Sequence, residues 1–164
     1  WTTLFVEGTH DNLDLLAQYP QEELGGAPAH HLGGRLWHLI RGEIYTLEGR
    51  TFLAMGGGES DGDTRGEPGE NWWPGELPRQ EELPAYRSIL EDRGRRVDYI
   101  VSHQAPTNIE SCLGRTPGEV NLLTAYLDEL QRVCSFDRWF FGCYHQNKVI
   151  PPKYYALYDK VQEV

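Results

Sequence analysis

Cysteine, basic residues and long apolar runs are all scarce in this chain of 164 residues. Its three cysteines are Cys112, Cys134 and Cys143, and no pair has CxxC spacing. An odd number without that spacing argues against a disulfide framework and favours a reducing compartment. No stretch is long and apolar enough for a transmembrane helix, and no signal peptide is visible. We therefore expect a cytoplasmic protein without membrane contact.

Positive charge is outnumbered, with 15 Lys and Arg residues against 25 Asp and Glu, which gives a formal net charge of -10. An acidic surface repels phosphate backbones, which argues against nucleic-acid binding through a basic groove. Bound divalent cations reverse the sign of the field locally, so metal-dependent phosphate chemistry stays open. Nothing in the composition indicates an oligomeric state.

The residues that are present predict one folded domain over residues 1–164, since 39% are hydrophobic and aromatic residues supply large apolar surfaces. Alternation and turn residues predict strands, and the stripe of apolar residues at helical spacing predicts helices. We expect strands at 2–6, 36–40, 97–101, 139–141, 148–150 and 154–158, a hairpin of 43–47 with 51–55, helices after Asp11 or Asn12, at 79–93 and across 122–130 with Pro117 near its start, and loops at 25–34 and 56–78. This mixture indicates an α/β fold with layered sheets covered by helices.

Three expected strands each end in a short polar segment that contains a histidine, namely His10, His103 and His145. Loops after strand ends are where α/β proteins gather ligands. A single histidine there is more often a satisfied polar residue. The repeated placement favours a shared site, because divalent-metal hydrolases need His, Asp and Asn side chains that converge from different elements.

The same segments resemble the ordered motifs of the calcineurin-like metallophosphoesterases. Residues 8–11 (GTHD) resemble the GNH[DE] motif, residues 102–106 (SHQAP) resemble [ST]HxxP, and residues 142–145 (GCYH) resemble GHxH. The glycines at 57–58 and the WWP cluster at 72–74 resemble the small bacterial and phage-type members. The order and separation of the motifs agree over nearly the whole chain.

That resemblance implies a layered α-β-β-α sandwich and a hydrolase for phosphate esters, either a phosphatase or a phosphodiesterase. It also implies a pair of divalent metal ions, Mn, Zn or Fe, whose bound hydroxide attacks phosphorus. His10 takes the catalytic position near the leaving group, and Asp11 takes the acidic position that orients this histidine.

The resemblance also assigns metal positions. Thr9, His103 and Cys143 match the ligands of the second metal, and His145 matches a ligand of the first. Two of these depart from the family pattern, because Thr9 replaces an amide and Cys143 replaces a histidine. A hydroxyl is a poorer ligand, and a thiolate suits Zn rather than Mn or Mg.

The family's opening motifs, DxH and GDxxD, are not found. Asp63 follows a glycine, but Gly66 stands where the second aspartate would be needed. The resemblance places both motifs before Trp1. We therefore expect this chain to be the C-terminal part of a longer parent that lacks the first strands, in preference to a degenerate relative.

Two other functions remain open. The departures at Thr9 and Cys143 also suit a catalytically inactive domain that serves as a binding or scaffolding module. A mononuclear zinc site built from His103, Cys143 and His145 is a third reading.

The long loop 56–78 is expected to lie near the histidines and to be more mobile than the rest of the chain, except around Trp72 and Trp73. Its Trp72 and Trp73 either line a lid or only bury surface. We expect its acidic residues to form a solvated surface in preference to a cation site; they are Asp61, Asp63, Glu67 and Glu70.

Overall fold

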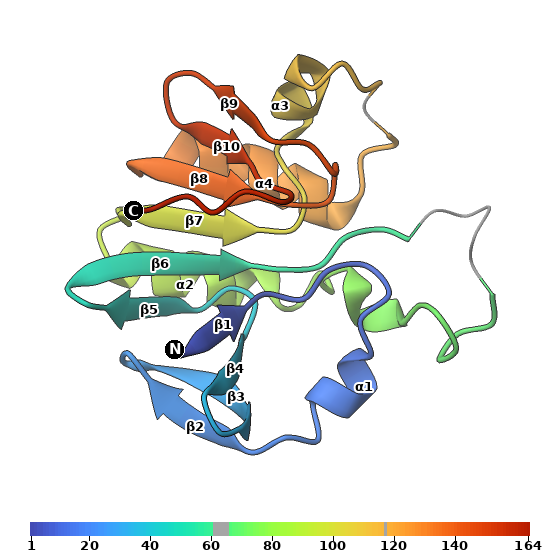
Figure 1. Cartoon of the computed structure of the whole chain (residues 1–164), viewed down its shortest axis with the longest axis vertical. Coiled ribbons are helices and arrows are strands. Elements are labelled where there is room, and N and C mark those ends of the chain that lie inside the picture. The colour runs from blue at the N-terminus through green and yellow to red at the C-terminus, as the bar shows by residue number, and fades with distance from the viewer. Residues whose placement is uncertain (61–65, 117) are drawn as a thin grey trace.

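The computed structural model describes residues 1–60, 66–116 and 118–164, and it shows a mixed α/β fold built on two sheets (Figure 1). The four-stranded sheet has the order β1-β4-β3-β2, and the six-stranded sheet has the order β5-β6-β7-β8-β10-β9. The strands are β1 (Thr3–Phe5), β2 (Gln21–Leu24), β3 (Ala27–Gly33), β4 (Leu36–Leu39), β5 (Ile44–Leu47), β6 (Arg50–Met55), β7 (Tyr99–Ser102), β8 (Arg138–Phe141), β9 (Lys148–Ile150) and β10 (Tyr154–Ala156).

Few helices accompany these sheets. They are α1 (Leu13–Leu16), the 3-10 turn η1 (Pro74–Glu76), α2 (Leu83–Asp92), α3 (Thr107–Cys112) and α4 (Leu122–Val133). A helix needs about 20 apolar residues to cross a bilayer. Within the described ranges no helix reaches the length and apolarity that this requires.

Alternation along β5 and β6 separates two apolar clusters, because successive strand residues point to opposite faces. Ile44 and Leu53 join a large cluster with residues of α2, α3 and α4. Their neighbours Tyr45 and Ala54 join a smaller cluster with residues of β3 and β4. The six-stranded sheet therefore has the helices on one face and the small sheet against part of the other, and Figure 1 shows α2 and α4 behind it.

This arrangement agrees with the expected α/β class. It does not confirm the four-layered α-β-β-α sandwich, because the helices that contribute to the cores all join the same cluster. The small sheet packs through Ala29 and Leu39 on β3 and β4. Among the described residues, a second helical layer over its other face is not seen.

Two local expectations were wrong. Residues 25–34 were expected to be loop, but β3 occupies most of them and pairs with both β2 and β4. Helix α3 was not expected at all. The start of α4 is capped by Asn121, whose side chain accepts from the amide of Thr124, and Pro117, the expected start, lies outside the described residues. Asp61 and Asp63 also lie outside them.

Candidate functional site

Three parallel strands end at one edge of the six-stranded sheet, and the predicted histidine turns follow two of them. β6, β7 and β8 pair in parallel, so their carboxyl ends lie at the same edge, where ligands of α/β proteins commonly bind. The chain leaves them toward Gly58, His103 and Cys143. The turn after β1 supplies His10 to the same place.

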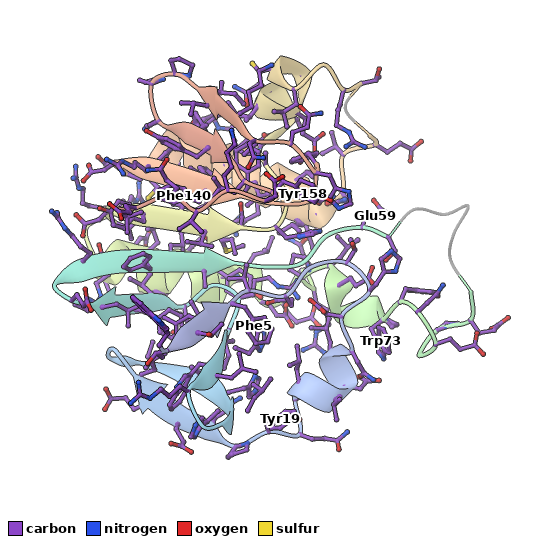
Figure 2. All side chains as sticks on the ribbon, in the orientation of Figure 1. Phe5, Tyr19, Glu59, Trp73, Phe140 and Tyr158 are labelled. Carbon is purple, nitrogen blue, oxygen red and sulfur yellow. The ribbon has the colours of Figure 1, made fainter. Side chains whose placement is uncertain are left out.

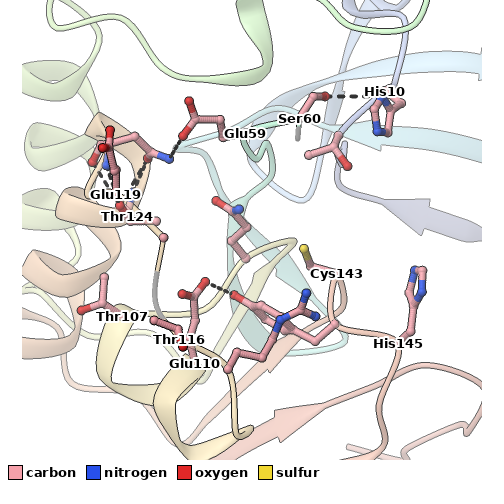
Figure 3. A pocket seen from close by; sticks show the side chains of 16 residues that line it. His10, Glu59, Ser60, Thr107, Glu110, Thr116, Glu119, Thr124, Cys143 and His145 are labelled. Atoms are coloured by element: carbon pink, nitrogen blue, oxygen red, sulfur yellow. Dashed lines mark hydrogen bonds between the residues drawn. The ribbon is translucent and has the colours of Figure 1, made fainter. Parts of the chain in front are cut away.

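A cleft of about 810 Å³ opens at this edge (Figure 3). Its walls come from the turn after β1, from the segments that follow β6, β7 and β8, and from α3, α4 and the segment between them. It is lined by Thr9, His10, Glu59, Ser60, Gln104, Thr107, Glu110, Arg115, Thr116, Gly118, Glu119, Asn121, Thr124, Cys143, Tyr144 and His145.

His10 stands in the left-handed region, with φ +68°. Its ring Nδ1 lies 2.5 Å from the carbonyl oxygen of Asn71 and 3.4 Å from Oγ of Ser60. Its amide donates to Oε1 of Glu76 over 3.0 Å. Left-handed backbone costs about 1–3 kcal/mol for a residue other than glycine and clusters at functional sites. Cys143 and His145, across the cleft in Figure 3, are also left-handed, with φ +57° and +51°.

His103 adjoins the cleft through its neighbours. A Cβ on Gly8 would lie 2.8 Å from its Cε1, and a Cβ on Gly58 would lie 3.0 Å from its Cδ2 and 2.9 Å from the methyl group of Thr9. Both glycines therefore let the backbone contact the imidazole. Nε2 of His103 is buried and lacks a hydrogen-bond partner within the described part of the chain, as does Oε1 of Gln104.

Burial lowers the pKa of His103, and acidic neighbours, Asp11 first among them, oppose that shift. The neutral imidazole that results is the form that binds metal ions. Burial also raises the pKa of the Cys143 thiol to about 11. Without a bound cation, Cys143 therefore stays a neutral thiol at pH 7, and zinc would have to displace its proton.

The cleft brings together four of the six residues that the sequence proposed, namely Thr9, His10, Cys143 and His145, and His103 lies next to it. Asp11 lies in the same turn, but its Oδ2 accepts from the amide of Gly8 over 2.7 Å. The ring of His10 contacts Asn71 and Ser60 instead, so Asp11 stabilises the turn.

The metal ligands are incompletely assembled. In the described ranges, no three His, Cys, Asp or Glu side chains come close enough together to hold a metal ion. His145 stacks on Tyr158, with ring centroids 5.0 Å apart, and Tyr158 lies on the exposed segment after β10 (Figure 2). The described residues therefore do not by themselves form a metal-binding group.

Two buried carboxylates at the cleft were missed by sequence reasoning. Glu76 is bonded to the lining residues His10 and Ser60. Glu110, on α3, accepts from the hydroxyl of Tyr144 over 2.5 Å, and that hydroxyl accepts from the amide of Ala105 over 2.9 Å. Glu110 thereby joins the turns after β7 and β8. Their burial had no signal in the sequence, because a carboxylate is almost never fully buried unless donors pair with it, and the donors that do so here lie far away along the chain.

The long loop behaves as expected in one respect, since Glu59 and Ser60 line the cleft. Figure 2 shows Glu59 where the chain leaves the sheet and Trp73 closer to α1. Trp73 is buried, whereas the indole of Trp72 donates to the carbonyl oxygen of Gly66 over 2.8 Å. Trp73 is thus a packing residue.

No protein-family model matches the sequence, and neither a curated protein nor a solved structure matches the chain.

Proposed function

We propose that this chain carries part of a metal-assisted phosphoester hydrolase site, with the ester bound in the cleft. The observation that supports it most is the buried, partnerless Nε2 of His103 beside a cleft that also holds His10, Cys143 and His145. Leaving a buried polar atom unpaired costs about 1–3 kcal/mol. A metal ion bound at Nε2 would remove that cost.

Each side chain has one role in this proposal. His103 and Cys143 would hold one divalent ion, with Thr9 beside them, and His145 would hold a second. Bound metal supplies a hydroxide nucleophile and neutralises charge on the phosphate. His10 holds the phosphate or protonates the leaving oxygen. The layered α-β-β-α sandwich and a cytoplasmic location, both suggested by the sequence, belong to the same proposal.

The ligand set predicts weak binding. Catalytic zinc sites usually have three protein ligands, and the described donors do not converge in such a group. Zinc is favoured over manganese, because a thiolate and an imidazole are softer ligands than carboxylates. This shortfall also supports a second candidate, a catalytically inactive domain that binds a partner or ligand in the same cleft.

The first prediction tests the metal ligand. We expect calorimetry to show zinc binding that His103→Ala weakens at least tenfold, because one of few ligands is lost. His31→Ala is the matched control, since His31 lies on β3, where it pairs with Glu22 and stacks on Trp37. Zinc affinity equal in the wild-type chain and His103→Ala would contradict the proposal.

Hydrolysis separates the two candidates. We expect slow, metal-dependent cleavage of bis(p-nitrophenyl) phosphate, which His10→Ala reduces without changing zinc affinity. Zinc binding without any cleavage favours the inactive domain. Fast manganese-dependent turnover by the 164-residue chain would show that the ligand count is wrong.

A further inference from the structure

Glu76, in η1, is a buried carboxylate, only 1% exposed, that is hydrogen-bonded to residues of the cleft wall. Its Oε1 accepts from the amides of His10 and Trp73, over 3.0 and 3.3 Å. Its Oε2 accepts from the amide and the hydroxyl of Ser60, over 3.1 and 2.6 Å. One side chain therefore joins the turn after β1 to the segment after β6, and both segments line the cleft.

Only a carboxylate can make all of these bonds. Three of the four donors are backbone N–H groups, which cannot become acceptors, and they approach both oxygens. An amide of the same size has one oxygen, so its NH2 group would face either the amides of His10 and Trp73 or the amide of Ser60. A buried donor that faces another donor loses its bond and its hydration together.

The backbone of Glu76 is itself held in place by hydrogen bonds from Arg41 and Gly58. Arg41 donates from Nη1 to the carbonyl oxygen of Glu76 over 3.3 Å and from Nη2 to that of Gly75 over 2.7 Å. Its Nε donates to the buried Glu7 over 2.9 Å. The amide of Gly58 donates to the same carbonyl oxygen of Glu76 over 3.2 Å. From this anchored backbone the carboxylate of Glu76 reaches His10 and Ser60, which line the cleft.

From this geometry we infer that Glu76 is the positioning residue of the cleft. It holds His10 in its left-handed conformation and keeps the hydroxyl of Ser60 beside the imidazole, so that His10 presents its ring to a phosphate ester in one orientation. Ser60 is 2% exposed and donates its hydroxyl proton to Glu76, so it orients the pair and does not act as a nucleophile. The inference rests on the proposed function only where it names the phosphate ester.

The test compares Glu76→Gln with the wild-type chain by amide hydrogen exchange. Hydrogen bonds to charged groups contribute about 1.5–3 kcal/mol, so we expect exchange at His10 or Ser60 to become about 10- to 100-fold faster. The amide of Leu127, in the core of α4, reports global opening, and the site effect must exceed any change there. Glu91→Gln is the matched control, because the side chain of Glu91 is exposed and forms a surface ion pair with Arg95.

A second arm follows the ring signals of His10 by NMR during titration with inorganic phosphate in the presence of zinc. We expect Glu76→Gln to weaken the phosphate response at least tenfold while zinc affinity is kept. Glu76→Asp keeps the charge but shortens the side chain, so it should disturb His10 or Ser60 as well. This variant replaces Glu76→Gln in both measurements if Glu76→Gln does not fold.

The outcomes are distinguishable. Exchange at His10 and Ser60 that changes no more than at Leu127 overturns the positioning role, whatever the phosphate result. A phosphate response that is equal in the variant and in the wild-type chain overturns it too. If the wild-type chain shows no phosphate response at His10, the proposed function fails, and the exchange arm still decides the role of Glu76.

Discussion

Replacing Glu7 with glutamine should destabilise the fold more than any neutral surface change, because Glu7 is the buried anion of a continuous chain of hydrogen bonds. Only 2% of the residue is exposed. Its Oε1 accepts from Nε of Arg41 and its Oε2 from Nε2 of His38, both over 2.9 Å. Burial raises the pKa of Glu7, but the bond from His38 and the charge of Arg41 outweigh it, and the net pKa is lowered.

The chain continues beyond His38. Nδ1 of His38 lies 3.0 Å from Nδ1 of His30, and Nε2 of His30 lies 3.2 Å from the side-chain nitrogen of Gln21. With Gln21 donating, His30 must donate from Nδ1 and His38 from Nε2 to Glu7. Every donor in this series of hydrogen bonds faces an acceptor, so the anion at Glu7 sets the direction of all of them.

The magnitude follows from what glutamine cannot do. Its single oxygen accepts from Arg41 or from His38, and its NH2 group then faces the other donor. Removing one partner of a buried ion pair costs about 3–5 kcal/mol. Because glutamine keeps one of the two hydrogen bonds, we expect a loss of unfolding free energy at the lower end of that range, about 3 kcal/mol. For a chain of this size each kcal/mol lowers Tm by about 2–4 °C, so we expect a drop of about 6–12 °C.

Thermal unfolding followed by circular dichroism at pH 7 measures this drop. Glu22→Gln is the matched control, because Glu22 has an exposed side chain and pairs with His31 on the same sheet; exposed pairs contribute about 0–1 kcal/mol. A Tm for Glu7→Gln within about 2 °C of the control would refute the claim that this anion holds β1 to β4 and Arg41.

Two further predictions concern pH and backbone fit. Burial lowers the pKa of His30 and His103 below their ordinary 6.5, and the pKa of Glu7 lies below 4.5. As pH falls, the unfolded chain therefore takes up protons at these groups at a higher pH than the folded chain does. The denaturant midpoint should fall as pH drops below about 6.5 and fall further below about 4.5, and a midpoint that stays level between pH 7 and 4 would contradict this. Gly42→Ala should cost about 3 kcal/mol, because Gly42 has φ +86° and its Cβ would lie 2.1 Å from Cδ1 of Tyr86. Gly49→Ala, with φ +78° and open space around it, should cost only about 1 kcal/mol in denaturant titrations. Equal losses of unfolding free energy in the two variants would show that the contact with Tyr86 does not contribute to the cost of Gly42→Ala.

Local patterns predicted much of the secondary structure. Asn12 caps α1, as its position before an apolar stretch suggested, and residues 48–49 form the turn of the β5–β6 hairpin. The stripe of α4 was read correctly because most of its apolar residues are buried. Strand β3 was missed because glycines at both of its ends suggested loop, and the pairing that makes it a strand comes from β2 and β4.

The sequence by itself determined the spacing of the histidine turns, since each of the three turns follows an apolar strand. In the structure these strands are β1, β7 and β8, and their ends reach the same cleft. It also determined the chemical shortfall at Thr9 and Cys143, because residue type sets ligand hardness. Only the tertiary structure decided which acidic residues matter there. Glu76 meets His10 across 66 positions and Glu110 meets Tyr144 across 34, and both are buried. A carboxylate is ordinarily solvated, and it becomes a structural anchor only when donors far away in the sequence enclose it, which no local pattern can specify.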